Sequence, residues 1–175
     1  LKNELMLVVS EVIRNAKGED LSSKEVDFFD IEWFESTRKL LRKVSHKGEE
    51  VGLRILKENL RLKHHDVLWE DGNKILLVNV LPSDAVVVQP KTMREMGTIC
   101  FEIGNQHIPI FIENDEIIIP YEDPIFNLLK KGGYEPFKAQ RIFEDMLKAS
   151  SDHEAPAKDH KIDTDQLFSK VFPSK

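Results

Sequence analysis

Residues 101–113 read FEIGNQHIPIFIE, and this stretch decides how the second half of the chain is expected to fold. Gly104 and Asn105 tolerate positive φ and therefore predict the end of a helix. The apolar run that begins at Pro109 predicts a strand, and His107 falls on the turn between the two elements. A side chain on such a turn projects away from the packed face of the helix. His107 is therefore the first candidate metal ligand of the chain.

The segments on either side of this stretch predict a β-α-β-β-α-β order. Upstream, a strand at 85–89 leads to a helix that begins at Thr92, where Glu95 completes a capping box. Downstream, strands at 109–112 and 116–120 flank a turn, a helix follows at 124–131, and the segment 134–143 closes the sheet. This order predicts a ferredoxin-like domain over residues 79–147.

The first part of the chain predicts short strands at near-regular spacing. Leu5–Ile13 and the stretch 27–33 (DFFDIEW) have the β-branched or aromatic content of strands. Residues 38–55 predict a hairpin that turns at 46–48, and residues 66–81 predict another that turns at 71–73. A β-rich domain, a small sandwich or barrel, is therefore expected over residues 1–78. The fold class is α+β.

The last part of the chain, residues 148–175, is polar and shows no hydrophobic period, which predicts a flexible tail. Near its end, QLFSKVF at 166–172 fits either a short amphipathic docking segment or part of an unstructured terminus.

Charge and cysteine content narrow the classes of function. Charged residues make up 32% of the chain and the formal net charge is -6, which argues against a nucleic-acid binder. The single cysteine, Cys100, excludes a disulfide within the chain and a zinc site made of several cysteines. The N-terminal residues do not resemble a signal peptide, and no apolar run is long enough to span a bilayer. These features predict a cytoplasmic protein without a membrane partner.

One histidine alone binds a metal ion weakly, so His107 needs further ligands. Two-fold symmetry would bring two copies of His107 together in an isologous interface. His153 and His160, which stand among carboxylates in the tail, could fill other positions, although a solvated tail explains them equally well. A site of carboxylates at Glu102 and in the turn 113–115 is another possibility. The plain alternative for His107 is a surface or helix-capping histidine.

Other candidate residues have simpler explanations. Met93 and Cys100 precede His107 at a spacing of seven and could offer sulfur to Cu(I), but such a stripe usually fills a core. His64 and His65 are neighbours in what reads as extended chain, so they are expected to point to opposite faces and to serve solubility. His46 belongs to a hairpin turn. No nucleophile elbow, phosphate loop or dinucleotide fingerprint is present, which predicts that the protein is not an enzyme.

Residues 26–143 resemble the UreE-type urease accessory proteins, a family of nickel metallochaperones. The most specific shared element is E-I-G-N-x-H at residues 102–107. The resemblance implies a β-rich N-terminal domain, a ferredoxin-like metal-binding domain, and a homodimer that holds Ni(II) between its two copies of His107. It also implies delivery of nickel to the urease apoprotein through a complex with the accessory GTPase.

The chain departs from the family pattern in two ways. The motif commonly carries arginine where this chain has Gln106. Some members also have extra histidines after the second strand of the metal domain and a long histidine-rich tail. Here that strand ends in PYEDP at 120–124 and the tail holds two histidines. One shared site per dimer is therefore expected.

The identity of the metal and two other functions stay open at this point. Zn(II) or Cu(II) could occupy the same site in vitro, because the Irving–Williams order favours copper over nickel at most nitrogen sites. A protein-interaction adaptor that binds no metal is the alternative function, together with an RNA-binding module, since the ferredoxin-like topology also serves RNA. A hydrolase with His107 as general base lacks a visible nucleophile.

Overall fold

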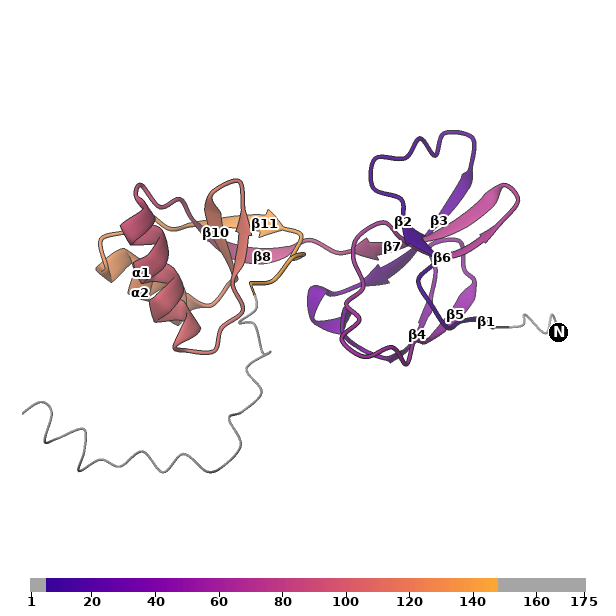
Figure 1. Cartoon of the computed structure of the whole chain (residues 1–175), viewed down its shortest axis with the longest axis horizontal. Helices are drawn as coiled ribbons and strands as arrows, with labels where there is room; N and C mark the ends of the chain where they lie inside the picture. The colour runs from indigo at the N-terminus through magenta and orange to yellow at the C-terminus, as the bar shows by residue number, and fades with distance from the viewer. Residues whose placement is uncertain (1–5, 148–175) are drawn as a thin grey trace, which may run out of the picture.

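The computed structural model describes residues 6–147, which form two domains, each around its own core (Figure 1). The N-terminal domain consists of strands and one 3-10 helix: β1 (Leu7–Val9), β2 (Arg14–Asn15), β3 (Glu25–Ile31), η1 (Trp33–Glu35), β4 (Leu40–Val44), β5 (Glu50–Arg54), β6 (Asp66–Asp71) and β7 (Lys74–Val80). The C-terminal domain contains β8 (Ser83–Val88), α1 (Met93–Gly104), β9 (Phe111–Glu113), β10 (Glu116–Pro120), α2 (Asp123–Lys131) and β11 (Phe137–Arg141). The α+β class is confirmed.

Two sheets enclose the core of the N-terminal domain. Their strand orders are β1-β5-β4 and β2-β6-β7-β3. Phe29 and Ile31 of β3, Val51 of β5 and Val78 of β7 are fully buried between them. The two predicted hairpins, β4–β5 and β6–β7, are confirmed as antiparallel pairs. The sheets also contain two parallel pairs, β1–β5 and β3–β7, which join segments far apart in the sequence.

Two of the predicted strands of the N-terminal domain end earlier than expected. The segment Leu5–Ile13 forms a strand only over Leu7–Val9 among its described residues. The stretch 27–33 ends as a strand at Ile31, and Trp33 begins the 3-10 helix instead. The Glu35 carboxylate accepts a hydrogen bond from the Glu32 N–H at 2.9 Å, which stabilises this turn against continuation of the strand.

The C-terminal domain has the predicted order of elements, β8-α1-β9-β10-α2-β11. Its sheet order is β11-β8-β10-β9, and every neighbouring pair is antiparallel. The Thr92 side chain accepts a hydrogen bond from the Glu95 N–H at 3.1 Å, as the capping box predicts. The Glu95 carboxylate, however, accepts from the Lys91 N–H rather than from Thr92.

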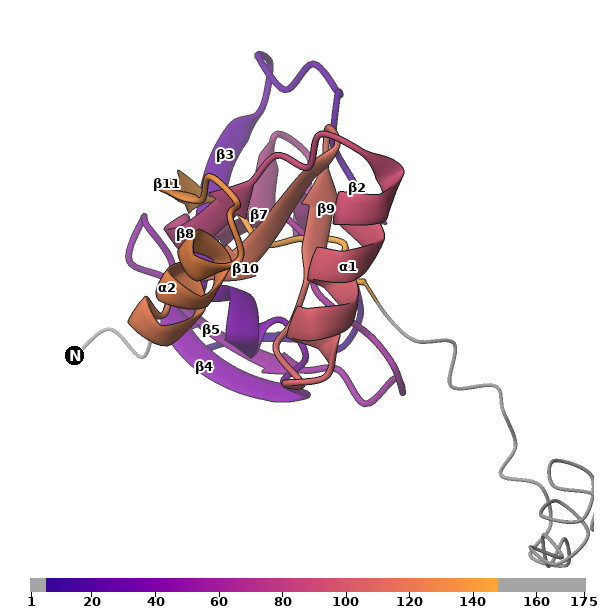
Figure 2. The same cartoon turned by 90° about the vertical axis from the view of Figure 1, so that its left-hand side faces the viewer.

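Both helices cover the same face of this sheet, on the side away from the N-terminal domain (Figures 1 and 2). Alternation along β8 explains this arrangement, because Val86 and Val88 pack with Ile99 and Ile103 of α1. Ala85 and Val87 of the same strand point to the opposite face. None of the helices within residues 6–147 is long and apolar enough to cross a membrane.

The opposite face of the C-terminal sheet meets the N-terminal domain through aromatic side chains. Trp33 lies with its ring centroid 6.0 Å from Phe111 and 5.4 Å from Phe143. Residues 142–147, which we name the junction segment, run between the domains. The Leu147 N–H donates to the Ile110 carbonyl at 2.7 Å, and Lys63 pairs with Asp145 at 2.7 Å. The two domains are therefore joined by packing as well as by the chain.

Candidate metal centre

His107 lies three residues after the last residue of α1, on an exposed turn. Its φ is 58°, and its N–H donates to the Gly104 carbonyl at 3.0 Å. The expectation that Gly104 or Asn105 takes the left-handed conformation was wrong: Gly104 is the last residue of the helix, and Asn105 has a φ of -63°. After the helix, residues 105–107 form a turn whose N–H groups donate to carbonyls of the last helical turn. The left-handed backbone conformation therefore falls on His107 itself.

The imidazole of His107 has no competing partner among the residues that the structure describes. In residues 6–147, side-chain hydrogen bonds engage His46 and His64 but not His107. The last turn of α1 contains no basic side chain, and the C-terminal end of a helix carries partial negative charge. Gln106, which stands where the motif commonly has arginine, adds no positive charge. The position therefore suits an incoming cation.

The face of α1 that precedes His107 is more apolar than an exposed helix needs to be. Met93 is 89% exposed and Phe101 is 70% exposed. Gly97 lies between them at helical spacing, and a Cβ added there would meet no atom within 4 Å. An unpartnered apolar helix face of this kind is typical of a protein-protein contact. Sequence reasoning missed it, although the spacing of four between these residues was readable.

Met93 and Cys100, the sulfur-containing side chains predicted to share one face of the helix before His107, differ in burial. Cys100 is half-buried and packs with Met96 against the core of the C-terminal domain, as predicted. Burial raises the pKa of the Cys100 thiol, so it stays protonated and is a poor metal ligand. Met93 was also expected in the core, and that expectation was wrong, because the side chain is exposed in the first turn of α1.

The remaining predicted ligands are not brought to His107 within one described chain. His153 and His160 lie outside the described residues. Across residues 6–147, no three His, Cys, Asp or Glu side chains gather in a way that could hold a metal ion. The alternative carboxylate site at Glu102 and the turn 113–115 is therefore not formed in this chain.

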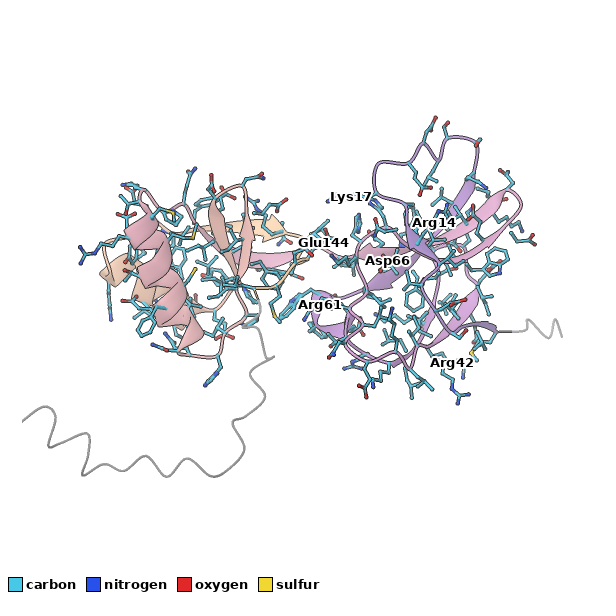
Figure 3. All side chains as sticks on the ribbon, viewed as in Figure 1. Arg14, Lys17, Arg42, Arg61, Asp66 and Glu144 are labelled. Atoms are coloured by element: carbon cyan, nitrogen blue, oxygen red, sulfur yellow. The ribbon has the colours of Figure 1, made fainter. Side chains whose placement is uncertain are left out.

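His64 and His65 overturn the expectation of opposite faces. Their ring centroids lie 4.0 Å apart, because His65 has a φ of 67° and the chain is not extended there. Both are half-buried and line a hollow of about 570 Å³ between the domains. The Val80 N–H donates to His64 Nδ1 at 3.1 Å, and the His64 N–H donates to Glu144 at 2.8 Å. Figure 3 shows Glu144 at this junction.

These contacts fix the chemical state of His64. Because Nδ1 accepts a hydrogen bond, the proton of the neutral ring sits on Nε2. Burial lowers the pKa of His64, and the neighbouring His65 lowers it further. A metal ion on Nε2 would require the proton to move to Nδ1 and would break the bond to Val80. His64 is therefore a structural residue rather than a ligand, and more than a solubilising one.

Comparisons with known proteins match the N-terminal part and the C-terminal part of the chain separately. Residues 9–81 match the N-terminal domain of the UreE urease accessory protein, and residues 83–166 match its C-terminal domain. A urease accessory protein UreE from Flavobacterium johnsoniae is 46% identical over 132 residues, 75% of this chain and 80% of the relative. One from Acetivibrio thermocellus is 46% identical over 132 residues, 75% of this chain and 86% of the relative. One from Actinobacillus pleuropneumoniae is 38% identical over 154 residues, 85% of this chain and 82% of the relative.

The class of protein is therefore an accessory factor with a role in urease maturation. The chain belongs to the UreE family of urease accessory proteins. Members of this family assist another protein rather than catalyse a reaction, so the prediction that the chain is not an enzyme is confirmed.

Proposed function

We propose that the protein binds Ni(II) through His107 and delivers it to the urease apoprotein during assembly of the urease active site. The observation that carries the proposal is the free, exposed imidazole at the end of α1, in a family of urease accessory proteins. Imidazole nitrogen is a good ligand for borderline divalent metals such as nickel. A delivery protein must also release its metal ion, and release is easier from a site with few protein ligands than from one in which protein ligands fill every coordination position.

The proposal includes a homodimer, because one described chain offers a single free imidazole at this place. Pairing the faces around Met93 and Phe101 across a two-fold axis would bury apolar surface in both copies at once. The axis would bring both copies of His107 to one metal ion. The helices lie on the side of the sheet away from the N-terminal domain, which leaves room for the second copy (Figure 1).

Several other parts of the proposal rest on the same family. The boundary between the predicted domains, 1–78 and 79–147, falls two residues before the end of β7 at Val80, which packs in the N-terminal core. The second domain is proposed to be ferredoxin-like, which its element order and antiparallel sheet support. Within the tail at 148–175, His153 and His160 add ligands. Transfer runs through the accessory GTPase and the urease apoprotein in the cytoplasm, a compartment that suits a chain with one cysteine.

Equilibrium dialysis against Ni(II), combined with the mass of the complex in solution, tests this function. A shared site predicts about half an equivalent of tightly bound nickel per chain, carried by a dimer. A full equivalent on a monomer, or no tight binding, would contradict the proposal. Competition with Zn(II) and Cu(II) in the same experiment measures the preference of the isolated site.

A further inference from the structure

One histidine of the N-terminal domain is bonded to both stretches of chain that lie between the domains. The Val80 N–H, at the end of β7 and directly before the link to β8, donates to His64 Nδ1 at 3.1 Å. The Glu144 carboxylate of the junction segment accepts from the His64 N–H at 2.8 Å. A change in the state of His64 therefore acts on the connection between the domains.

Backbone contacts fix the position of the histidine pair within the N-terminal domain. The His64 carbonyl accepts from the Asn15 side chain at 2.9 Å, and the His65 N–H donates to the Val78 carbonyl at 2.9 Å. These bonds do not involve either imidazole. The bond from Val80 does, because its acceptor is a ring nitrogen, so it is the bond that depends on protonation.

Protonation of the His64 ring is incompatible with the bond from Val80. A neutral imidazole offers one nitrogen as an acceptor, whereas an imidazolium carries N–H groups on both nitrogens. In the charged ring, Nδ1–H would point at the N–H of Val80, and neither group can accept. Val80 is 1% exposed, so its N–H cannot reach water in place of the lost acceptor unless the chain moves.

Burial and nearby charges oppose protonation while the ring is in this position. Burial lowers the pKa of His64 most, and His65, whose ring centroid lies 4.0 Å away, lowers it further. Lys17, from the segment after β2, also lowers this pKa, whereas Glu144 raises it. Figure 3 shows Lys17 and Glu144 at the junction of the two domains.

The other charged groups near the histidine pair are exposed or engaged with one another. They come from β6, β9, β11 and the junction segment: the buried Asp66, the exposed Glu113, Arg141 and Asp145. Arg141 pairs with Glu116 at 3.2 Å, and Asp145 pairs with Lys63 at 2.7 Å. The Asp66 carboxylate accepts from the Lys63 N–H at 2.8 Å. His65, Lys17 and Glu144 are therefore the groups whose charge acts on the ring.

The direction of the response to pH follows from these contacts. A ring released to solvent recovers the ordinary histidine pKa of about 6.5, above the lowered pKa of the engaged ring. The released arrangement therefore takes up a proton more readily. The engaged arrangement is favoured above about pH 6.5 and loses stability as pH falls from there toward its lower pKa.

The aromatic contacts between the domains do not share this dependence. Trp33, Phe111 and Phe143 carry no group that gains or loses a proton in this range, so their packing persists in acid. The hollow of about 570 Å³ beside the histidines leaves room for the ring and the neighbouring chain to move. Loss of the Val80 bond therefore frees the link without parting the domains.

We propose that the His64–His65 pair is an acid-sensitive switch for the arrangement of the two domains. Protonation of His64 releases the Val80 backbone, and the C-terminal domain then takes up a range of orientations about the link at 81–82. A return to neutral pH restores the bond and the single orientation. This inference concerns the domain junction and does not depend on metal binding.

The test follows the full chain without added metal from about pH 7.5 to about pH 5.5, on either side of the ordinary histidine pKa. Residual dipolar couplings measure the relative orientation of the domains, and hydrogen exchange measures the protection of single amides. The Leu81 N–H is the internal control, because its acceptor, the Ile31 carbonyl at 2.9 Å, does not titrate. NMR titration of the His64 ring gives the pH at which it is protonated.

We expect the protection of the Val80 amide to fall by up to about tenfold per pH unit below about pH 6.5, because release takes up one proton. Protection of Leu81 should stay within about twofold over the same range. The couplings of the two domains should fit one fixed orientation at neutral pH and no longer fit it in acid. Equal losses at both amides would mean general acid unfolding and would overturn the proposal. A fixed domain orientation after release of Val80 would also overturn it.

Two variants separate the switch from other effects of acid. His64→Asn keeps an acceptor near Val80 but cannot take up the proton, so its domains should hold one orientation at about pH 5.5. His46→Asn is the matched control: it removes another hydrogen-bonded histidine, whose Nε2 lies 2.7 Å from an Asp30 oxygen, and should respond as the parent protein does. A response of His64→Asn equal to that of the parent protein would overturn the proposal.

The parent protein alone gives a second test that needs no variant to fold. The midpoint of the His64 ring titration and the midpoint of the change in domain orientation should coincide. Midpoints more than about one pH unit apart would mean that another group controls the junction, and would overturn the proposal.

Discussion

The histidines at the end of α1 and at the domain junction show how one residue type serves two purposes in one chain. His107 is exposed, and no side-chain hydrogen bond within residues 6–147 uses its imidazole. His64 is half-buried, accepts a hydrogen bond from Val80 and packs against His65. The ring of His107 is the proposed metal ligand, whereas the ring of His64 holds two parts of the fold together. A histidine pair in a sequence therefore need not mark a metal site, because here the ring of His64 is engaged in a structural hydrogen bond.

Replacement of His107 with alanine should give the largest effect in this comparison. We expect His107→Ala to lose the tight nickel site entirely, from about half an equivalent per chain to none, while the fold is retained. The side chain is exposed, so its loss leaves no cavity. Calorimetric titration with Ni(II) measures the loss, and His64→Ala is the matched control that should keep the site. Undiminished nickel affinity in a folded His107→Ala variant would contradict the assignment.

Replacement of Phe101 with glutamate should separate the proposed dimer. Two added carboxylates that face each other across a two-fold axis would be partly buried without partners, which is expected to weaken association by about a hundredfold. Sedimentation or mass measurements across a range of concentrations detect the change. Ile13→Glu, at a side chain that is 52% exposed on the other domain, is the control. A Phe101→Glu protein that remains dimeric would mean that this face is not the contact.

Replacement of His64 should act on stability and leave nickel binding unchanged. In His64→Ala the Val80 N–H loses its acceptor, which is expected to cost about 1–3 kcal/mol of unfolding free energy. The amide oxygen that His64→Asn introduces can lie near the place of Nδ1 and should recover part of that loss. Denaturant unfolding of the parent protein and both variants gives the comparison. Equal stabilities of His64→Ala and the parent protein would mean that the hydrogen bond contributes nothing.

Acid should produce the smallest effect, also through His64. The pKa of this histidine is lowered in the folded protein, so near pH 6.5 the unfolded chain takes up the proton more readily. The stabilisation is present above about pH 6.5 and decreases as pH falls from there toward the folded-state pKa. Unfolding measured from about pH 7.5 to about pH 5.5, on either side of the ordinary histidine pKa, should show a steeper decline for the parent protein than for His64→Asn. Parallel declines would remove His64 as the cause.

The sequence predicted those parts of the fold that depend on local chemistry. The turns at 46–48 and 71–73 contain glycines with positive φ, Gly48 and Gly72, so both hairpins were readable from short stretches. The cap at Thr92 was also predictable, because its hydrogen bond joins residues only three positions apart, Thr92 and Glu95. The parallel pairs β1–β5 and β3–β7 were not, because their partners are far apart in the sequence and no turn connects them directly.

The same contrast holds for the candidate sites: those that depend on local sequence were predicted, and those that depend on tertiary contacts were not. The E-I-G-N-x-H motif pointed to His107 because the family shares it and the turn is local. The contact of His64 with His65 depends on a left-handed His65, which no rule for extended chain anticipates. The exposure of Met93 depends on which neighbours tertiary packing supplies. Such neighbours are set by the whole fold rather than by spacing.

The link between β7 and β8 has a consequence for how a dimer would meet other proteins. Only Leu81 and Pro82 separate the two strands, and the backbone is hydrogen-bonded just before and within the link, at Val80 and Leu81. Such a short, bonded link leaves little rotational freedom between the domains, so a two-fold axis through α1 would hold both N-terminal domains at a set separation. A partner with two matching sites would lose little further entropy on its second contact. It would bind with an avidity that either contact alone cannot give.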